Sequence, residues 1–155
     1  MSNKKNIKFN IPIDNEGFIT LNCPHCNFAF KLEFSIANDE NVIILYCPSC
    51  GLSSYPNNFI PLKILKHAET LISNEMKNIL NDFTDNLEKT FKKNKYVSFK
   101  KNKNFKIEIP EPLFETNHEL ETLELNCCNS KVKALKANIL TGIYCPYCGV
   151  KSDGV

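Results

Sequence analysis

The chain of 155 residues contains no arginine, since all 19 of its basic residues are lysines. Arginine most often makes the bidentate contacts that read guanine and clamp phosphate, so sequence-specific binding of DNA is disfavoured. Long apolar runs are also missing, and the longest, Val42–Cys47, is far shorter than the ~20 residues that span a bilayer. The basic segment Met1–Phe9 lacks the apolar core of a signal peptide. We therefore expect a cytoplasmic protein that does not enter a membrane.

Recognisable catalytic motifs are missing as well. The three histidines, His25, His67 and His118, are scattered along the chain, and the sequence has no Ser/His/Asp set, H-E-x-x-H motif or phosphate-binding loop. A zinc ion held by four sulfur ligands has no open position for water or substrate. We therefore expect a protein that is not an enzyme.

Eight cysteines in four close pairs are what the chain does have. Three pairs have the form C-P-x-C, and two thiolates at this spacing can bind one metal ion. Between Cys26 and Cys47 lie 20 residues, within the usual spacing of a four-cysteine zinc site. Each pair is followed by Asn or Gly, which tolerate the positive φ that a metal knuckle requires. The pattern predicts two Zn²⁺ ions with the ligands Cys23, Cys26, Cys47, Cys50, Cys127, Cys128, Cys145 and Cys148.

Disulfides, redox thiols and iron–sulfur clusters are the alternatives to zinc. A cytosolic chain keeps its thiols reduced, and a thioredoxin-type motif needs a βαβ context that this sequence does not have. Segments of about 40 residues rarely fold on apolar burial alone. Zinc would supply on the order of 10 kcal/mol of folding free energy per site, so we prefer it.

The sequence around the cysteines is repeated. Leu21–Cys23 resembles Leu125–Cys127, and Leu45–Gly51 resembles Ile143–Gly149. Aligning the copies places a two-residue deletion between the first two ligands of the second copy, so that Cys127 and Cys128 are adjacent. The normal knuckle turn cannot form there.

The adjacent cysteines leave the ligands of the second site open. Either both Cys127 and Cys128 bind the metal in strained geometry, or one binds and another donor completes the site. His118 is the nearest histidine, although a solvated position in a linker is the plainer interpretation of it. We expect the second site to hold zinc more weakly.

An apolar strand is expected in the first copy. Phe28, Phe30, Leu32 and Phe34 recur at every second position, which predicts a strand with one apolar face. Val42–Tyr46 is expected to return as a second strand. The apolar face is interpreted as a small core packed on the long helix, in preference to an exposed site for a partner.

Residues 61–93 have the period of an amphipathic helix. Pro61 suits its first turn, and ~30 residues would extend roughly 45 Å. One ribbon cannot cover this length, so the helix either breaks near Asn81, packs under both ribbons or pairs with a second copy in a homodimer. Its apolar positions are Leu65, Ala68, Ile72, Met76, Ile79, Phe83, Leu87 and Phe91.

A basic segment follows the helix. Tyr96, Phe99 and Phe105 lie among its lysines, and Lys101–Lys103 could form the turn of a hairpin. Such a segment can bind phosphates and stack on bases, whereas a solvated hairpin with buried aromatic rings is the plainer interpretation. The candidate nucleic-acid-binding residues here and in the second ribbon are Lys92, Lys93, Lys95, Lys100, Lys101, Lys103, Lys106, Lys131, Lys133 and Lys136.

The formal net charge of +2 overstates the attraction to nucleic acid. Eight thiolates and two Zn²⁺ ions change it to about −2. Six glutamates between residues 108 and 124 can also neutralise lysines within the fold. The charge of the metal-loaded chain therefore weakens the argument for a nucleic-acid partner.

The segments Cys23–Gly51 and Cys127–Gly149 resemble the zinc-ribbon superfamily, specifically small bacterial proteins with two ribbons joined by a helical segment. The resemblance covers roughly residues 18–56 and 120–152. It implies a small, metal-stabilised α+β fold, in which two four-cysteine ribbons of short antiparallel β hairpins flank a long amphipathic helix and a basic β hairpin. Zinc ribbons serve in transcription factors, ribosomal proteins, topoisomerases and adaptors, so the fold does not determine the function.

Two functions follow from these observations. In the first, which we prefer, a protein partner docks on an apolar surface of the first ribbon or of the helix, and the chain is a non-enzymatic adaptor. In the second, the lysines contact DNA or RNA phosphates without sequence preference. The expected segments are residues 1–60 with the first ribbon, 61–93 with the helix, 94–117 with the basic hairpin and an acidic, proline-containing linker, and 118–155 with the second ribbon.

Overall fold

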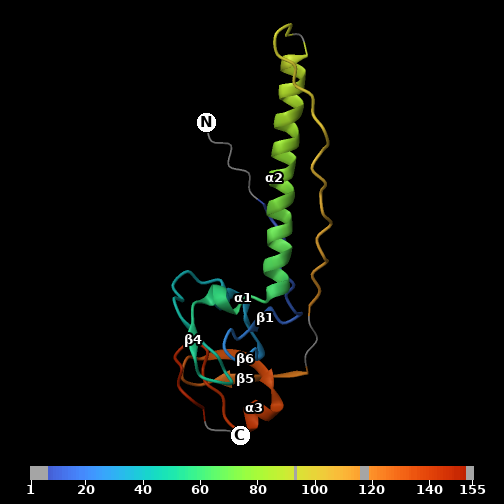
Figure 1. Ribbon diagram of the computed structural model, residues 1–155. Helices are drawn as coiled ribbons and strands as arrows, with labels where there is room; N and C mark the ends of the chain where they lie inside the picture. The colour runs from blue at the N-terminus through green and yellow to red at the C-terminus, as the bar shows by residue number, and fades with distance from the viewer. Residues whose placement is uncertain (1–6, 93, 116–118, 153–155) are drawn as a thin grey trace. The chain divides into compact units, whose positions relative to one another are not determined.

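The computed structural model describes residues 7–92, 94–115 and 119–152 (Figure 1). These residues form two compact units, each described here by itself. The ribbon unit lies within residues 10–64 and 113–155, and the helical unit lies within residues 1–9 and 65–112. Of the helices in the described ranges, none is both long enough and apolar enough to cross a membrane.

Antiparallel sheets build the ribbon unit, which confirms the α+β prediction. A four-stranded sheet has the order β1-β2-β6-β5, and a second sheet pairs β3 with β4. In the second copy a single bridge between Tyr144 and Lys151 takes the place of that small sheet. The elements are β1 (Phe18–Asn22), β2 (Ala29–Glu33), α1 (Phe34–Ala37), β3 (Leu45–Tyr46), β4 (Ser53–Ser54), a 3-10 turn (Pro56–Phe59), β5 (Leu120–Leu125), β6 (Ser130–Leu135) and α3 (Lys136–Leu140).

The two copies of the repeat pair with each other through their central strands. β2 and β6 are antiparallel neighbours, with Lys31 opposite Lys133 and Leu32 opposite Val132. Lys31 and Lys133 are also equivalent positions in the repeat, so an approximate two-fold axis passes between them. The two ribbons therefore form one sheet and share one core.

The first ribbon differs from its prediction in detail. The apolar strand is confirmed in β2 but ends at Glu33, and the expected return strand is reduced to Leu45–Tyr46. The ring of Phe30 meets Phe59 edge to face, with centroids 5.8 Å apart. The expected packing of this strand on the long helix is wrong, because the core around Phe30 contains no described residue of that helix. The second copy supplies the missing partners instead, including Val132.

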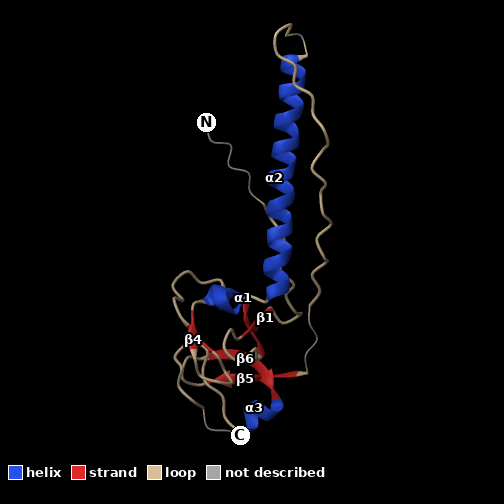
Figure 2. Cartoon of the chain, in the orientation of Figure 1, coloured by secondary structure: helices blue, strands red, loops and turns tan. Residues whose placement is uncertain are grey.

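The long helix is confirmed as α2 (Leu62–Phe91), which has 30 residues and no break at Asn81. The basic hairpin expected after it is wrong, because residues 94–115 contain no strand. Within the helical unit, residues 94–112, here called the strap, instead extend beside α2 (Figure 2). The strap does not pair with itself because side chains of α2 bind its peptide groups.

Three side chains spaced seven residues apart on α2 hold the strap. Asn81 exchanges two hydrogen bonds with the backbone of Phe105, at 3.1 and 2.9 Å. Asn74 does the same with Glu108, at 2.6 and 2.9 Å. His67 Nδ1 lies 2.7 Å from the carbonyl oxygen of Glu111.

The spacing of these contacts has a simple geometric cause. Seven helical residues advance about 10.5 Å, and three extended residues advance about 10 Å. An asparagine at every seventh position of α2 therefore meets every third peptide group of an antiparallel extended chain. This match fixes the register of the strap.

Candidate metal centres

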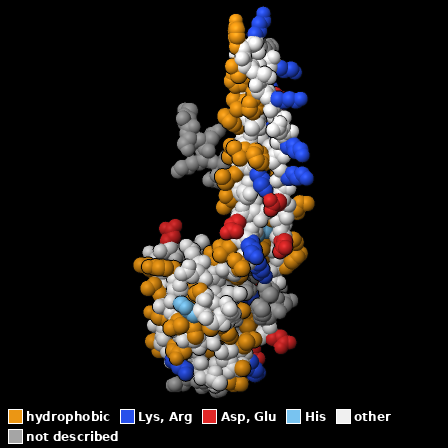
Figure 3. All heavy atoms as spheres, in the orientation of Figure 1, with side chains coloured by type: hydrophobic (Ala, Val, Ile, Leu, Met, Phe, Trp, Pro, Cys, Tyr) orange, Lys and Arg blue, Asp and Glu red, His pale blue; other side chains and the backbone are white. Residues whose placement is uncertain are grey.

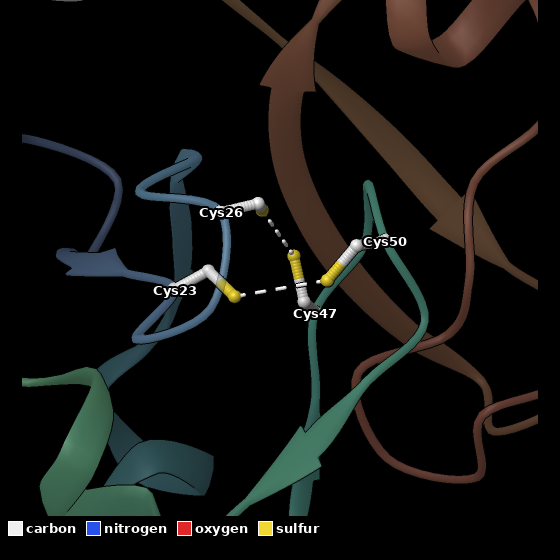
Figure 4. A group of neighbouring side chains, drawn as sticks. All are labelled: Cys23, Cys26, Cys47 and Cys50. Carbon is white, nitrogen blue, oxygen red and sulfur yellow. Dashed lines mark hydrogen bonds between the residues drawn. The ribbon is translucent and has the colours of Figure 1, made fainter.

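Site one is built from two knuckles of the same form. Cys23 and Cys26 lie in the loop between β1 and β2, and Cys47 and Cys50 lie in the loop between β3 and β4. In the first knuckle the N–H of Asn27 donates to Cys23 O at 2.9 Å. In the second, a bond of the same length joins the residue after Cys50 to Cys47 O. Both turns direct their cysteine side chains to one point (Figure 4).

The predicted positive φ angles after the cysteine pairs are confirmed. They are 57° at Asn27, 73° at Gly51, 47° at Asn129 and 72° at Gly149. This conformation turns backbone N–H groups toward the sulfur atoms, and only Gly and, less readily, Asn adopt it at low cost.

The sulfur positions of site one fit a tetrahedral ion. Cys23 Sγ lies 3.8 Å from Cys50 Sγ, and Cys26 Sγ lies 3.7 Å from Cys47 Sγ. All four sulfur atoms lie within 4.8 Å of one another. A zinc ion at about 2.3 Å from four thiolates places them about 3.8 Å apart, whereas a disulfide bond needs about 2 Å. The four cysteines are free thiols arranged for a metal ion.

One buried thiol in each site, Cys47 or Cys145, needs a cation in order to ionise. Burial raises the pKa of Cys47 even though the N–H groups of Cys50 and Ser49 hydrogen-bond to its sulfur. Burial likewise raises the pKa of Cys145 in site two. Such thiols are neutral at pH 7 unless a bound cation stabilises the thiolate.

Site two brings the adjacent cysteines to the same cluster. The sulfur atoms of Cys127, Cys128, Cys145 and Cys148 all lie within 4.8 Å of one another. Cys148 Sγ is 3.6 Å from Cys127 Sγ. Both adjacent cysteines are therefore in reach of one ion, and a fourth donor from elsewhere is not required. His118, the alternative donor, lies outside the described residues.

The contracted knuckle is a shortened hairpin loop. In the first copy the pair Asn22–Ala29 closes a loop of residues 23–28, and in the second the pair Leu125–Ser130 closes a loop of residues 126–129. The loop is two residues shorter, while the strand pairing on either side is preserved. Its backbone contact, from Cys128 N to Leu125 O, is a long 3.4 Å.

The second knuckles of the two sites touch each other reciprocally. Tyr46 N–H donates to Pro146 O at 2.8 Å, and Tyr144 N–H donates to Pro48 O at 2.9 Å. The Tyr144 ring lies on Gly51, where a Cβ would be 3.0 Å from the ring. In the same way, the Tyr46 ring lies within 2.8 Å of a Cβ built on the glycine that follows Cys148. Sequence reasoning missed this contact, although the repeat had aligned the two tyrosines.

A buried ion cluster lies where the copies meet. Lys133 Nζ and Lys31 Nζ lie 2.8 and 3.3 Å from the same oxygen of Asp14. Lys31 also pairs with Glu115, and Lys133 with Glu16 at 3.2 Å. Burial opposes ionisation of Asp14, but bonds from Lys133 and from two backbone N–H groups outweigh it and lower its pKa to about 2. The sequence signal was a lysine at the same strand position in both copies.

The lysines suggested for nucleic acid fall into two groups. Four form ion pairs: Lys133 as above, Lys131 with Glu124, Lys136 with Glu121, and Lys101 with Asp85. Lys93 lies outside the described residues. The rest make no ion pair with a described residue, and they are Lys92, Lys95, Lys100, Lys103 and Lys106.

No protein-family model, curated protein or solved structure matches this chain. The chemistry of the two sites therefore rests on their own geometry. Each consists of four thiols at metal-binding distances beside a β hairpin, like the sites of zinc ribbons. An ion bound by all four sulfurs of a site would have a complete tetrahedral shell.

Proposed function

We propose that this protein is a non-enzymatic, zinc-stabilised adaptor that binds a protein partner through one face of α2. The observation that carries the proposal is a row of five exposed apolar side chains on that helix. Zinc fits the sulfur spacing, and its two ions would supply on the order of 10 kcal/mol each to folding. In this proposal the metal holds the scaffold and α2 makes the contact.

The apolar row follows the spacing of a helix–helix interface. Its members are separated by seven, four, three and four residues, which keeps them on one face of the helix. Each is between 41% and 60% exposed. Figure 3 shows apolar side chains along one side of the helical unit. The row consists of Leu65, Ile72, Met76, Ile79 and Phe83.

The strap leaves this row uncovered. Asn74 and Asn81, which bind the strap, lie on the side of α2 opposite Ile72 and Ile79. A solvent-exposed apolar surface of this length is typical of a binding site. The acidic Glu69 interrupts the row near its beginning, so the continuous part runs from Ile72 to Phe83.

The proposal is tested by photo-crosslinking in cells. A photoreactive residue at Met76 should yield one reproducible adduct with another protein, and the same residue at exposed Lys66, on the polar flank of α2, should not. Ile79→Asp should abolish the adduct while leaving two zinc ions per chain and the helix content unchanged. Equal adducts from both positions, or an adduct that survives Ile79→Asp, would overturn the proposal.

A further inference from the structure

The residues that follow α2, including most of the strap, form the most positive segment of the chain. Residues 92–107 contain seven lysines and no acidic residue. All eight cysteines belong to the ribbon unit, so the thiolate charge that lowers the net charge of the chain is not carried by this segment. This segment is therefore strongly positive even when the metal-loaded chain as a whole is not.

Most lysines of this segment are available, in contrast to those of the ribbon unit. Lys31 and Lys133 are buried in the cluster around Asp14, and Lys131 and Lys136 each have a glutamate partner. Five lysines of the segment are exposed and form no ion pair with a described residue. We call these five the basic row: Lys92, Lys95, Lys100, Lys103 and Lys106.

The strap arranges three of the five lysines of the basic row in a line. Every third peptide group of the strap bonds to α2, at Phe105 and Glu108. A chain held at this period places every third side chain on the same side. Lys100, Lys103 and Lys106 share that period and are spaced about 10 Å apart. In Figure 3, lysine side chains follow one edge of the helical unit, on the side away from the apolar row.

An exposed aromatic ring lies at the start of this line. Tyr96 is 96% exposed, the highest value among the large hydrophobic side chains described. Its position is set by the Asn94 side chain, whose Oδ1 accepts the N–H of Tyr96 at 2.8 Å and of Val97 at 3.2 Å. A ring that the turn holds in the solvent in this way can stack on a planar ligand.

A hollow beside the turn adds a second contact surface. It has a volume of about 560 Å³, and its lining includes Phe91, Phe99, Lys92 and Lys100. Asp85 and Glu88 also line it, together with Lys89, and the carboxylate of Asp85 is neutralised by Lys101 at 2.5 Å. Aromatic surface and lysine ammonium groups are the two kinds of contact that a nucleotide needs.

We propose that the basic row binds single-stranded nucleic acid, with its phosphates on the lysines and a base stacked on Tyr96. A line of lysines fits a linear polyanion better than it fits the flat surface of a membrane. Stacking on Tyr96 requires an unpaired base, which favours a single strand over a duplex. The absence of arginine predicts binding without sequence preference. This surface is separate from the apolar row, so it does not depend on the adaptor role.

The test is fluorescence anisotropy with labelled single-stranded 15-mers of dT and of U, at 50 and 200 mM salt. Five phosphate contacts predict about a 100-fold weaker affinity at the higher salt, since each contributes a slope of about 0.7. Replacing Lys100, Lys103 and Lys106 by Ala should make the slope less steep by about 2. All five lysines are exposed, and zinc content with thermal melting verifies that each variant is folded.

Two further variants make the test specific. Tyr96→Ala should weaken binding about 5- to 150-fold, and Tyr96→Phe should restore it because the ring is kept. The matched control replaces Lys131 and Lys136 by Ala, which removes charge from ion-paired lysines and should leave the affinity unchanged. The proposal is overturned if neither oligonucleotide binds, if the control weakens binding as much as the basic-row variant, or if phosphatidylserine vesicles bind and the oligonucleotides do not.

Discussion

The two cysteine clusters contain the same ligands at similar distances, but they differ in how the protein surrounds them. In site one Cys23 and Cys47 are buried and Cys50 is half-buried, whereas in site two only Cys145 is buried. The shorter loop of residues 126–129 has fewer atoms to cover its sulfurs. A two-residue deletion has thus kept the ligand geometry and removed part of the shield.

The strand pairing explains why the deletion was tolerated. Loop residues changed, while β5 and β6 retained six matched pairs from Leu120–Leu135 to Leu125–Ser130. The second copy also keeps its second knuckle, which packs on the second knuckle of site one through Tyr46 and Tyr144. Both sites therefore share the placement of their ligands, but site one shields its sulfurs from solvent more than site two does.

The largest expected effect comes from removing equivalent ligands. Cys26 and Cys128 occupy matching positions, and both are exposed. Cys26→Ser should abolish metal binding at site one and unfold the ribbon unit, because about 10 kcal/mol per site is comparable to the whole stability of a domain. Cys128→Ser should lose the second ion and retain the fold, because site two has three exposed sulfurs and is expected to bind its ion more weakly, so that its ion contributes less to folding than that of site one. Zinc content and far-UV circular dichroism measure both.

A chelator titration of the unmodified protein tests the same contrast. Site two should release its ion first, because three of its four sulfurs are open to water and to the chelator. Release of both ions at one chelator concentration, or equal unfolding of the two serine variants, would show that protection does not distinguish the sites.

The next effect concerns the ion cluster at the two-fold axis. Asp14→Asn leaves two buried lysines without their shared carboxylate, which should cost about 3–5 kcal/mol of unfolding free energy. Asp39→Asn is the control, because Asp39 is a turn residue whose side chain bonds only to Asn41 among the described residues. Denaturant unfolding of the zinc-loaded protein measures the difference.

The pH dependence of this effect follows from the lowered pKa. Asp14 has a pKa of about 2 in the folded chain and 3.8 as the reference value. It is ionised in both states above about pH 5, so the difference between wild type and Asp14→Asn should be constant from pH 5 to 8. The contribution of about 2 kcal/mol is lost only as pH falls from about 4 to 2. A difference that shrinks between pH 7 and 5 would contradict the assignment.

A smaller effect is expected at the glycines between the two knuckles. Gly149→Ala places a Cβ 2.8 Å from the Tyr46 ring, and Gly51→Ala places one 3.0 Å from the Tyr144 ring. Gly17→Ala is the matched control, since Gly17 also has a positive φ but nothing within 4 Å of a Cβ. The control should cost about 1 kcal/mol through its backbone.

Gly149→Ala should cost about 1–3 kcal/mol more than the control, because overpacking adds to the strain of its backbone. It should also disturb site one, whose knuckle carries Tyr46. The absorption spectrum of Co²⁺ bound at site one would show whether the substitution in site two disturbs the ligands of site one. Equal costs for Gly149→Ala and Gly17→Ala would show that the ring contact is without consequence.

Features encoded locally were predictable from the sequence. The ligand spacing, the positive φ at Asn27 and Gly51, and the extent of α2 each depend on a few adjacent residues. The pairing of β2 with β6 was not predictable in this way, because it joins segments about 100 residues apart. The repeat contained its signal, since a two-fold arrangement places Lys31 opposite its own equivalent.

The strap shows why the hairpin prediction failed. Aromatic residues among the lysines and a turn signal at Lys101–Lys103 suggested a hairpin, but such a pattern does not reveal what will bind the peptide groups. Asn74 and Asn81 bind them instead. An asparagine at every seventh helical position is a detectable signal, and its partner at every third extended residue is not visible until the two segments are placed together.

The smallest effect comes from the tyrosine hydroxyl in the second knuckle of the second copy. Tyr147 stands where site one has Ser49, and its Oη is buried without a hydrogen-bond partner among the described residues. Ser49 Oγ, in contrast, lies 3.3 Å from Asn138 Nδ2. Tyr147→Phe removes the unpaired oxygen and keeps the ring, so it should raise the unfolding free energy by up to about 1 kcal/mol. Ser49→Ala, which removes a paired hydroxyl, should lower it slightly. Thermal unfolding distinguishes the two signs, and a destabilising Tyr147→Phe would mean that the tyrosine oxygen has a partner in solution.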